Sequence, residues 1–112
     1  MDHEKILVIA AHPDDIDFRC AGSVALWSRE GRHVEYVVCT SGEKGFNGNG
    51  ASTLSIEERR KIRETEQRAA AETVGTKAVH FLRHTDGELA NTAELRRDLV
   101  RVMRQVKPDP VI

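Results

Sequence analysis

A continuous aliphatic stretch, Lys5–Ala11 (KILVIAA), leads directly into His12-Pro13-Asp14-Asp15 and decides how the rest of the chain is interpreted. An unbroken apolar run between polar residues is typical of a strand that is buried on both faces of a parallel sheet. The run is far too short to cross a bilayer, which takes about 20 residues. It also lacks the preceding basic segment of a signal peptide. We therefore predict a buried parallel strand that ends where the polar residues begin.

Strand and helix patterns alternate along the rest of the chain. Further strands are expected at His33–Thr40, at Ala78–Leu82 and, from its first residues, at Asp109–Ile112. Helices are expected at Ala21–Glu30, from the capping box Ser55/Glu58 to Gly75, and from an Asn91 cap to Pro108, with an apolar stripe of Leu95, Leu99, Val102 and Val106. This alternation predicts an α/β fold: a parallel sheet with helices on both faces.

The composition narrows the class of protein. The 112 residues include 17 Lys+Arg and 18 Asp+Glu, a formal net charge of −1, which argues against a dedicated nucleic-acid-binding protein. Hydrophobic residues at 39% and charged residues at 31% describe an ordinary globular protein with no membrane partner. Two cysteines, Cys20 and Cys39, are too few for a disulfide framework and favour a reducing compartment. We therefore expect a cytoplasmic protein.

Titratable residues follow each of the first three expected strands. They lie in the segments His12–Asp15, Thr40–Glu43 and His84–Glu88. The carboxyl ends of parallel strands share one edge of the sheet, and ligands bind there in open α/β folds. The sequence therefore predicts a functional site at this edge.

The first of these segments has the residue types of a metal site. His12 and Asp15 supply an imidazole and a carboxylate three residues apart, which in a turn can point at one divalent cation. Pro13 stiffens the turn, and Asp14 is placed to act as general base on a metal-bound water. The alternative is that Asp14 or Asp15 only caps the following helix, where aspartate is favoured.

The ordered set of motifs resembles the LmbE-like, or PIG-L-type, zinc-dependent N-deacetylases. The matching segments are Ala11-His12-Pro13-Asp14-Asp15, Cys20-Ala21-Gly22-Ser23, Cys39-Thr40-Ser41-Gly42-Glu43, Arg63-Glu64-Thr65-Glu66 with Ala69-Ala70 and Val74-Gly75, Phe81-Leu82 with Asp86-Gly87, and Lys107-Pro108-Asp109. The resemblance covers essentially the whole chain, with the motifs in the family's order.

This resemblance implies a hydrolase that removes the N-acetyl group from an N-acetylglucosamine-containing small-molecule substrate. His12 and Asp15 would be zinc ligands and Asp14 the general base. Arg63 and Asp86 match positions that hold the sugar. Without the resemblance, the simpler interpretation of Arg63 is a surface ion pair with Glu66.

Two departures from the family pattern shape the expectations. The family usually has Glu where this chain has Ile16, and Asp17 comes next. The family also takes its remaining zinc ligand and a catalytic histidine from a segment after strand four. We therefore expect residues 1–112 to be the N-terminal part of a single Rossmann-like deacetylase domain, truncated at the start of strand four. A missing C-terminal segment, or a second copy in a homo-oligomer, would complete the site.

Other interpretations stay open at this stage. A receiver-like α/β module that binds Mg²⁺ also has paired aspartates after strand one, but it needs an acceptor Asp near Leu82. A family member that binds a sugar without cleaving it is a further alternative. We expect His84 to be an exposed loop histidine and the charge run Glu57–Arg68 to be a solvated helix face. The glycine-rich segment Gly42–Gly50 is either a lid or disordered.

Overall fold

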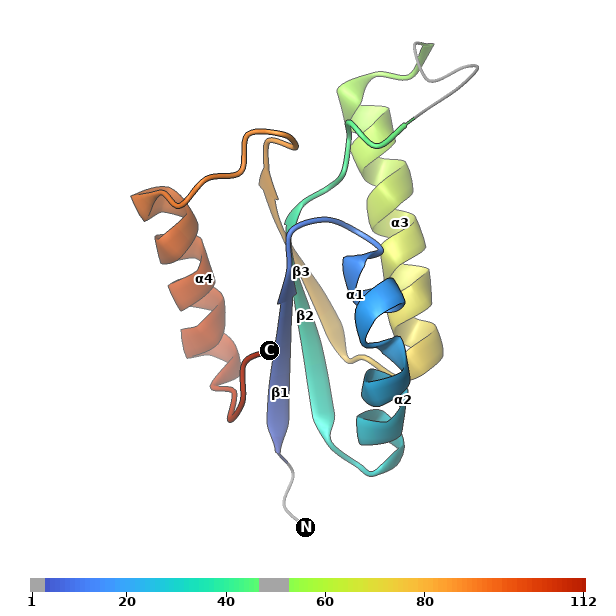
Figure 1. Cartoon of the computed structure of the whole chain (residues 1–112), viewed down its shortest axis with the longest axis vertical. Helices are drawn as coiled ribbons and strands as arrows, with labels where there is room; N and C mark the ends of the chain where they lie inside the picture. The colour runs from blue at the N-terminus through green and yellow to red at the C-terminus, as the bar shows by residue number, and fades with distance from the viewer. Residues whose placement is uncertain (1–3, 47–52) are drawn as a thin grey trace.

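The computed structural model describes residues 4–46 and 53–112, so residues 47–50 of the segment Gly42–Gly50, interpreted as a lid or as disordered, lie outside the described residues. The strands β1 (Lys5–Ala10), β2 (His33–Thr40) and β3 (Ala78–His84) form one parallel sheet in that order. Helices α1 (Asp15–Arg19), α2 (Ala21–Arg29) and α3 (Ile56–Val74) cover one face, and α4 (Ala93–Val106) covers the other (Figure 1). The predicted α/β sheet with helices on both faces is confirmed.

The core consists of two apolar layers, one on each face of the sheet. Alternate residues of β1 point to opposite faces, which explains its unbroken aliphatic run. On the side of α1–α3 the buried cluster contains Ile6, Val8, Ile16, Val24, Val34, Tyr36 and Ala71. On the side of α4 it contains Leu7, Val37, Val102 and Val106, with Leu99 packed against it. The apolar stripe expected for the last helix is therefore the stripe that packs on the sheet.

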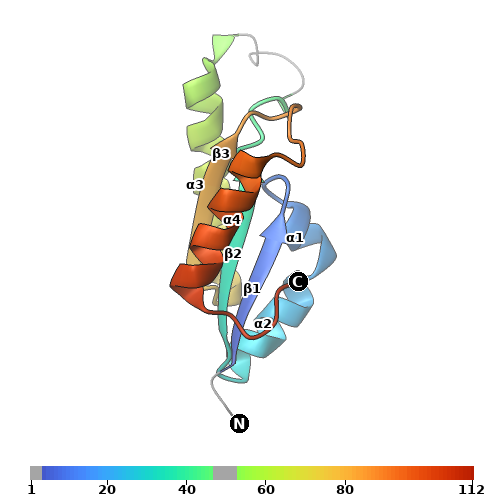
Figure 2. The same ribbon diagram turned by 90° about the vertical axis from the view of Figure 1, so that its left-hand side faces the viewer.

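The segment after α4 returns to the free edge of β1. The Leu7 N–H donates to the carbonyl of Pro110 (3.1 Å), and the Ile112 N–H donates to the carbonyl of Leu7 (2.9 Å). The bridge between Leu7 and Val111 is parallel, and Figure 2 shows this segment running beside β1. The expected start of a fourth strand is confirmed.

This order of strands decides between the two predicted fold types. β1 lies between β2 and the segment that contains Val111, whereas in a receiver-like sheet it lies between β2 and β3. The receiver-like interpretation is therefore wrong, and the order is that of a Rossmann-like sheet. The chain changes direction across the sheet next to β1, so the end of β1 is the point where such folds bind ligands.

Local signals set most helix ends. The Glu58 N–H donates to the Ser55 hydroxyl at 3.1 Å, which confirms the predicted cap of α3. The cap of α4 is Thr92 and not Asn91, since the Thr92 hydroxyl accepts from the Leu95 N–H at 3.1 Å. The helix expected at Ala21–Glu30 is preceded by the short helix α1, and the two are separated at Cys20, whose φ of −146° interrupts the helix.

The end of α3 provides a test of the packing between α2 and α3. Gly75 has a φ of +89°, and a Cβ there would lie 2.9 Å from the Cβ of Ser28. Gly31 has the same φ but open space around it. We expect Gly31→Ala to lower the free energy of unfolding by about 1–2 kcal/mol, from backbone strain alone. Gly75→Ala should cost about 1–3 kcal/mol more, because the added methyl overpacks the contact.

Urea unfolding of the two variants measures this difference. Equal losses of stability would mean that α2 and α3 do not pack closely at Ser28.

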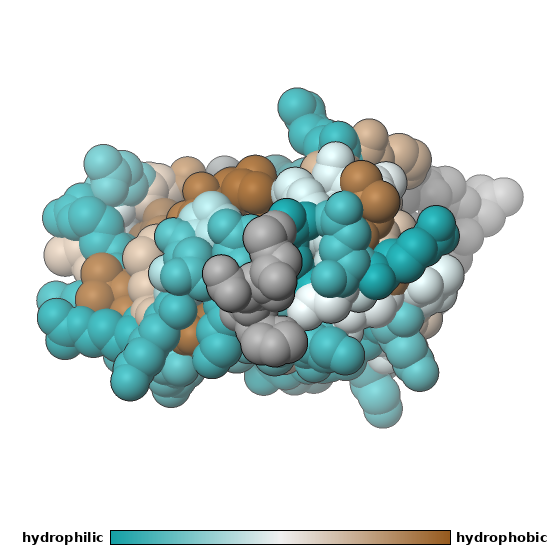
Figure 3. Space-filling model, turned by 90° about the horizontal axis from the view of Figure 1, so that it is seen from below, coloured by the Kyte–Doolittle hydropathy of each residue, from teal (hydrophilic) through white to brown (hydrophobic). Residues whose placement is uncertain are grey.

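The end of the molecule where the strands begin is mainly polar (Figure 3). In the ranges 4–46 and 53–112, no helix combines the length and apolar character needed to span a membrane. Figure 3 looks at the end of the molecule opposite the carboxyl edge of the sheet, where hydrophilic side chains dominate and hydrophobic patches are separate.

Candidate active site at the carboxyl edge of the sheet

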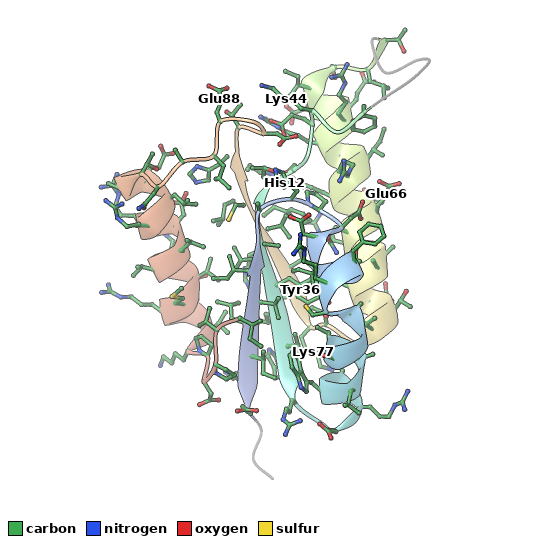
Figure 4. The ribbon with its side chains drawn as sticks, in the orientation of Figure 1. His12, Tyr36, Lys44, Glu66, Lys77 and Glu88 are labelled. Atoms are coloured by element: carbon green, nitrogen blue, oxygen red, sulfur yellow. The ribbon has the colours of Figure 1, made fainter. Side chains whose placement is uncertain are left out.

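The three segments that follow the strands meet at one edge of the sheet. The Nε2 atom of His12, after β1, lies 3.4 Å from Oδ1 of Asp86, after β3. The other carboxylate oxygen of Asp86 accepts from the Lys44 N–H, after β2, at 2.8 Å. Figure 4 shows His12 and Lys44 at this end of the molecule. The structure therefore brings the three predicted segments into contact.

His12 and Asp15 form the part of the site that fits a divalent cation. The Nδ1 atom of His12 and the Oδ2 atom of Asp15 are 3.3 Å apart, and both side chains are nearly half exposed. The same Asp15 oxygen accepts from the His12 N–H at 3.0 Å, which closes the turn. A neutral imidazole and a carboxylate that converge in this way are suitable donors for zinc. Two of the usual three protein ligands of a catalytic zinc would thus come from this turn.

Asp14 directly precedes α1, in the N-cap position, but its side chain does not cap the helix. Its side chain makes no hydrogen bond to the N–H groups of the first turn, so the capping interpretation of Asp14 is wrong. Its backbone is left-handed, with a φ of 77°, a strained conformation for aspartate. The carboxylate is 46% exposed and lies 3.5 Å from a guanidinium nitrogen of Arg63. It is therefore accessible at the edge of the sheet, beside the pair His12 and Asp15.

Arg63 reaches this edge from α3. Its guanidinium donates to the carbonyls of Pro13 (3.2 Å) and Gly42 (3.3 Å), so it holds the segments after β1 and β2 together. A Cβ on Gly42 would lie 3.1 Å from the guanidinium carbon, which explains the glycine at this position. The expected ion pair between Arg63 and Glu66 does not occur among the contacts of the described residues.

Asp86 is buried and connects the segments after β2 and β3. Its own N–H donates to Oε2 of Glu43 at 2.9 Å, and its carboxylate accepts from the Lys44 N–H. This reciprocal pair of bonds fixes the position of the Asp86 carboxylate beside His12. Burial raises the pKa of Glu43, but hydrogen bonds from Arg60 and the Asp86 N–H outweigh it, so the pKa lies below its usual range.

The inner face of α3 carries four polar residues, of which sequence reasoning found Arg63 and missed the other three. Arg60, Arg63, Glu64 and Gln67 follow the spacing i, i+3, i+4 and i+7, and Glu64 and Gln67 are buried. The prediction of a solvated face for Glu57–Arg68 is therefore wrong for these four. Their spacing places them on one side of α3, but a buried stripe is usually apolar, so four polar residues at this spacing give the same pattern as a solvated face.

Glu64 is the centre of this stripe. It accepts from the Ser41 hydroxyl at 2.5 Å and from two nitrogens of Arg83, both at 2.9 Å. Burial raises the pKa of Glu64, but the bonds from Arg83 and Ser41 outweigh that effect, and the pKa lies below its usual range. The network links β3, the segment after β2 and α3.

This lowered pKa predicts a dependence of stability on pH. The unfolded chain takes up a proton on Glu64 near pH 4.3, above the pKa of the folded state. The stabilisation is therefore fully present above about pH 4.3 and is lost as the pH falls through the folded-state pKa. We expect Glu64→Gln to lower the free energy of unfolding by about 1–2 kcal/mol at pH 7, because Arg83 is largely exposed and solvent screens its charge.

Urea unfolding at pH 7 and pH 3.5 checks this prediction. The difference between wild type and Glu64→Gln should shrink at pH 3.5, whereas the exposed control Glu72→Gln should stay within about 0.5 kcal/mol at both values. A difference that does not change with pH would contradict it.

His84 is not the exposed loop residue that was expected. It is the last residue of β3, its side chain is 15% exposed, and its Nε2 lies 2.7 Å from Oδ2 of Asp98. His84, Glu94 and Asp98 have ligand atoms within 4.8 Å of one another, a spacing that suits a metal ion. Asp98 is already paired with both His84 and Arg101, however, and this pairing accounts for the cluster as a contact between β3 and α4.

A groove opens beside the end of β1. It has a volume of about 520 Å³ and is lined by His12, Asp15, Arg19 and Ile112, among others. The candidate metal pair is therefore accessible from this groove, at the position where the strand order reverses.

Together these features define a Rossmann-like α/β protein with a histidine and two aspartates at the reversal point of its sheet. The family model described as PIG-L, GlcNAc-PI de-N-acetylase, matches residues 7–112, and the chain belongs to that family.

Two relatives show how far the similarity extends. The chain is 32% identical over 111 residues to a diacetylchitobiose deacetylase of Thermococcus kodakarensis, covering 99% of this chain and 40% of the relative. The crystal structure of the N,N'-diacetylchitobiose deacetylase from Pyrococcus horikoshii superposes with a TM-score of 0.90 at 34% identity, covering 98% of this chain and 40% of that one. The chain thus spans about two fifths of the length of these relatives.

The same fold also hosts a different chemistry. GalB of Pseudomonas putida KT2440, a 4-carboxy-2-hydroxymuconate hydratase, superposes with a TM-score of 0.82 at 27% identity, covering 96% of this chain and 45% of that one. The reaction must therefore be argued from the residues at the edge of the sheet and not from the fold.

Proposed function

We propose that the protein is a metal-dependent hydrolase that removes the N-acetyl group from an N-acetylglucosamine-containing substrate. Residues 1–112 would form the N-terminal part of a single Rossmann-like deacetylase domain. The observation that carries the proposal is the turn in which His12 and Asp15 converge at 3.3 Å with the Asp14 carboxylate exposed beside them. Membership of the PIG-L family and the similarity to diacetylchitobiose deacetylases support it.

The cofactor we propose is zinc, held by His12 and Asp15. When bound, zinc polarises the acetyl carbonyl and makes water acidic enough to be deprotonated by a carboxylate. Catalytic zinc sites normally use three protein ligands, so a further ligand would come from a segment outside residues 1–112 or from a second copy.

Asp14 would act as the general base. Its carboxylate takes a proton from the attacking water and returns a proton to the leaving nitrogen, which departs as an amine. A base of this kind must be accessible to water, and the side chain of Asp14 is 46% exposed beside Arg63.

Arg63 and Asp86 would hold the sugar. The guanidinium fork of Arg63 suits hydroxyl groups, and the carboxylate of Asp86 accepts hydrogen bonds from them. Both side chains are already hydrogen-bonded to backbone groups at the edge of the sheet, so little conformational entropy would be lost when they bind the sugar.

We also propose a cytoplasmic location, which the two free cysteines support.

The test measures zinc content and acetate release together. We expect the full-length protein to bind about one zinc per site and to release acetate from chitobiose-type N-acetylglucosaminides. Binding of the sugar without acetate release would instead support the sugar-binding alternative. Hydration of an unsaturated tricarboxylic acid without deacetylation would replace the proposal with hydratase chemistry.

A further inference from the structure

Gln67 is a buried amide that bonds to the turn carrying the candidate catalytic residues. Its side chain is fully buried, with a relative exposure of 0%. Its Oε1 accepts from the Asp14 N–H at 2.8 Å, and its Nε2 donates to Oδ2 of Asp17 at 3.3 Å. A buried amide is costly unless both its donor and its acceptor are paired, and here both partners lie in one short segment.

The bond to Asp14 stabilises a strained backbone. A left-handed conformation at a residue other than glycine costs about 1–2 kcal/mol, so neighbouring contacts must maintain it. Two side chains of α3 hold the turn: Arg63 bonds to the carbonyl of Pro13, and Gln67 bonds to the N–H of Asp14. The Pro13 carbonyl and the Asp14 N–H belong to the same peptide group, so α3 holds both polar groups of that peptide.

The conformation at Asp14 separates the roles of two adjacent carboxylates. Asp15 folds back on His12, whereas the carboxylate of Asp14 lies on the side of Arg63. If the backbone at Asp14 relaxed, its carboxylate would no longer be held in this place. Misplacement of a reacting group by about 1 Å can cost on the order of 100-fold in rate.

We propose that Gln67 is a positioning residue that fixes the backbone of Asp14 and thereby the general base. The proposal rests on the proposed function for its catalytic consequence. Gln67 is too deeply buried to touch a substrate, so it acts only through Asp14. Arg63 and Gln67 together make α3 the rigid support of the turn after β1.

The test compares a variant that removes the bonds with one that restores them. Gln67→Met keeps the length of the side chain and loses both hydrogen bonds. The double variant Gln67→Glu with Asp17→Asn exchanges donor and acceptor, so a carboxylate accepts from the Asp14 N–H and the new amide donates to that carboxylate. The full-length protein is used throughout, and melting temperature and zinc content are recorded for each variant.

Two readouts decide the result. In the metal-free protein, hydrogen exchange of the Asp14 N–H should become at least about 10-fold faster in Gln67→Met and return towards the wild-type rate in the double variant. For the zinc-loaded protein, compared at equal zinc content, Gln67→Met should lower kcat by about 10–100-fold with KM unchanged, and the double variant should recover most of the loss.

The proposal is overturned if exchange at Asp14 does not respond, or if kcat of Gln67→Met stays at the wild-type value below its melting temperature. If the wild-type protein releases no acetate, the proposed function fails and the catalytic role of Gln67 fails with it. The exchange measurement then still shows whether Gln67 fixes the backbone of Asp14.

Discussion

Asp14→Asn is expected to lower kcat for acetate release by roughly 10²–10⁴-fold, the range that general acid–base catalysis contributes. Asparagine has nearly the same shape but cannot take a proton from water. The bond from the Asp14 N–H to Gln67 comes from the backbone, so the substitution leaves it intact. Steady-state kinetics with an N-acetylglucosaminide substrate, at matched zinc content, measures the effect.

A matched control is available at the same edge of the sheet. Glu88 is exposed after β3 (Figure 4), and Glu88→Gln removes a nearby carboxylate without touching the turn after β1. We expect its kcat to stay close to the wild-type value. Wild-type kcat in Asp14→Asn would rule out the general-base role, and loss of zinc in the same variant would show that Asp14 is a ligand.

Asp15→Asn is expected to weaken zinc binding by more than about 100-fold. Loss of a residue that is hydrogen-bonded to a metal ligand already lowers metal affinity by about 10–100-fold, so loss of a charged ligand itself should lower it more. Activity should fall with zinc occupancy. The turn itself should survive, because the amide oxygen of asparagine can still accept from the His12 N–H.

This substitution separates a metal ligand from a residue that only shapes the turn. Zinc content after dialysis and the melting temperature of the metal-free protein are the two measurements. A ligand role predicts loss of zinc with little change in melting temperature. Unchanged zinc content would contradict that role and leave Asp15 as a residue that closes the turn.

The strands and α4 were predictable because their signals are local. The aliphatic run of β1 predicts its strand correctly. The run is unbroken because helices pack on both faces of the sheet, so successive residues are buried on alternate faces. The apolar stripe of α4 has the helical period and packs on the sheet. The cap of α4 was misplaced by one residue, because Asn91 and Thr92 are both good caps and the choice depends on the path of the preceding loop.

The site was only partly predictable. The convergence of His12 and Asp15 follows from their spacing in a turn, and the structure brings them together. The roles of Glu64 and Gln67 could not be found in this way. Both lie in a charged helix that, taken alone, is indistinguishable from a solvated one, and their partners are distant in sequence.

The sequence by itself therefore determined the alternation of strands and helices, the family and the turn that carries His12, Asp14 and Asp15. The helices, the strands and the turn depend on contacts between residues that are close in sequence, so they appear in the sequence as periodic or regularly spaced residues. The family is found from the order of such motifs. Only the tertiary structure decided the strand order and the support of the turn by α3. Gln67 and Asp14 are 53 residues apart, and a hydrogen bond over such a separation exists only after the helix has packed on the sheet.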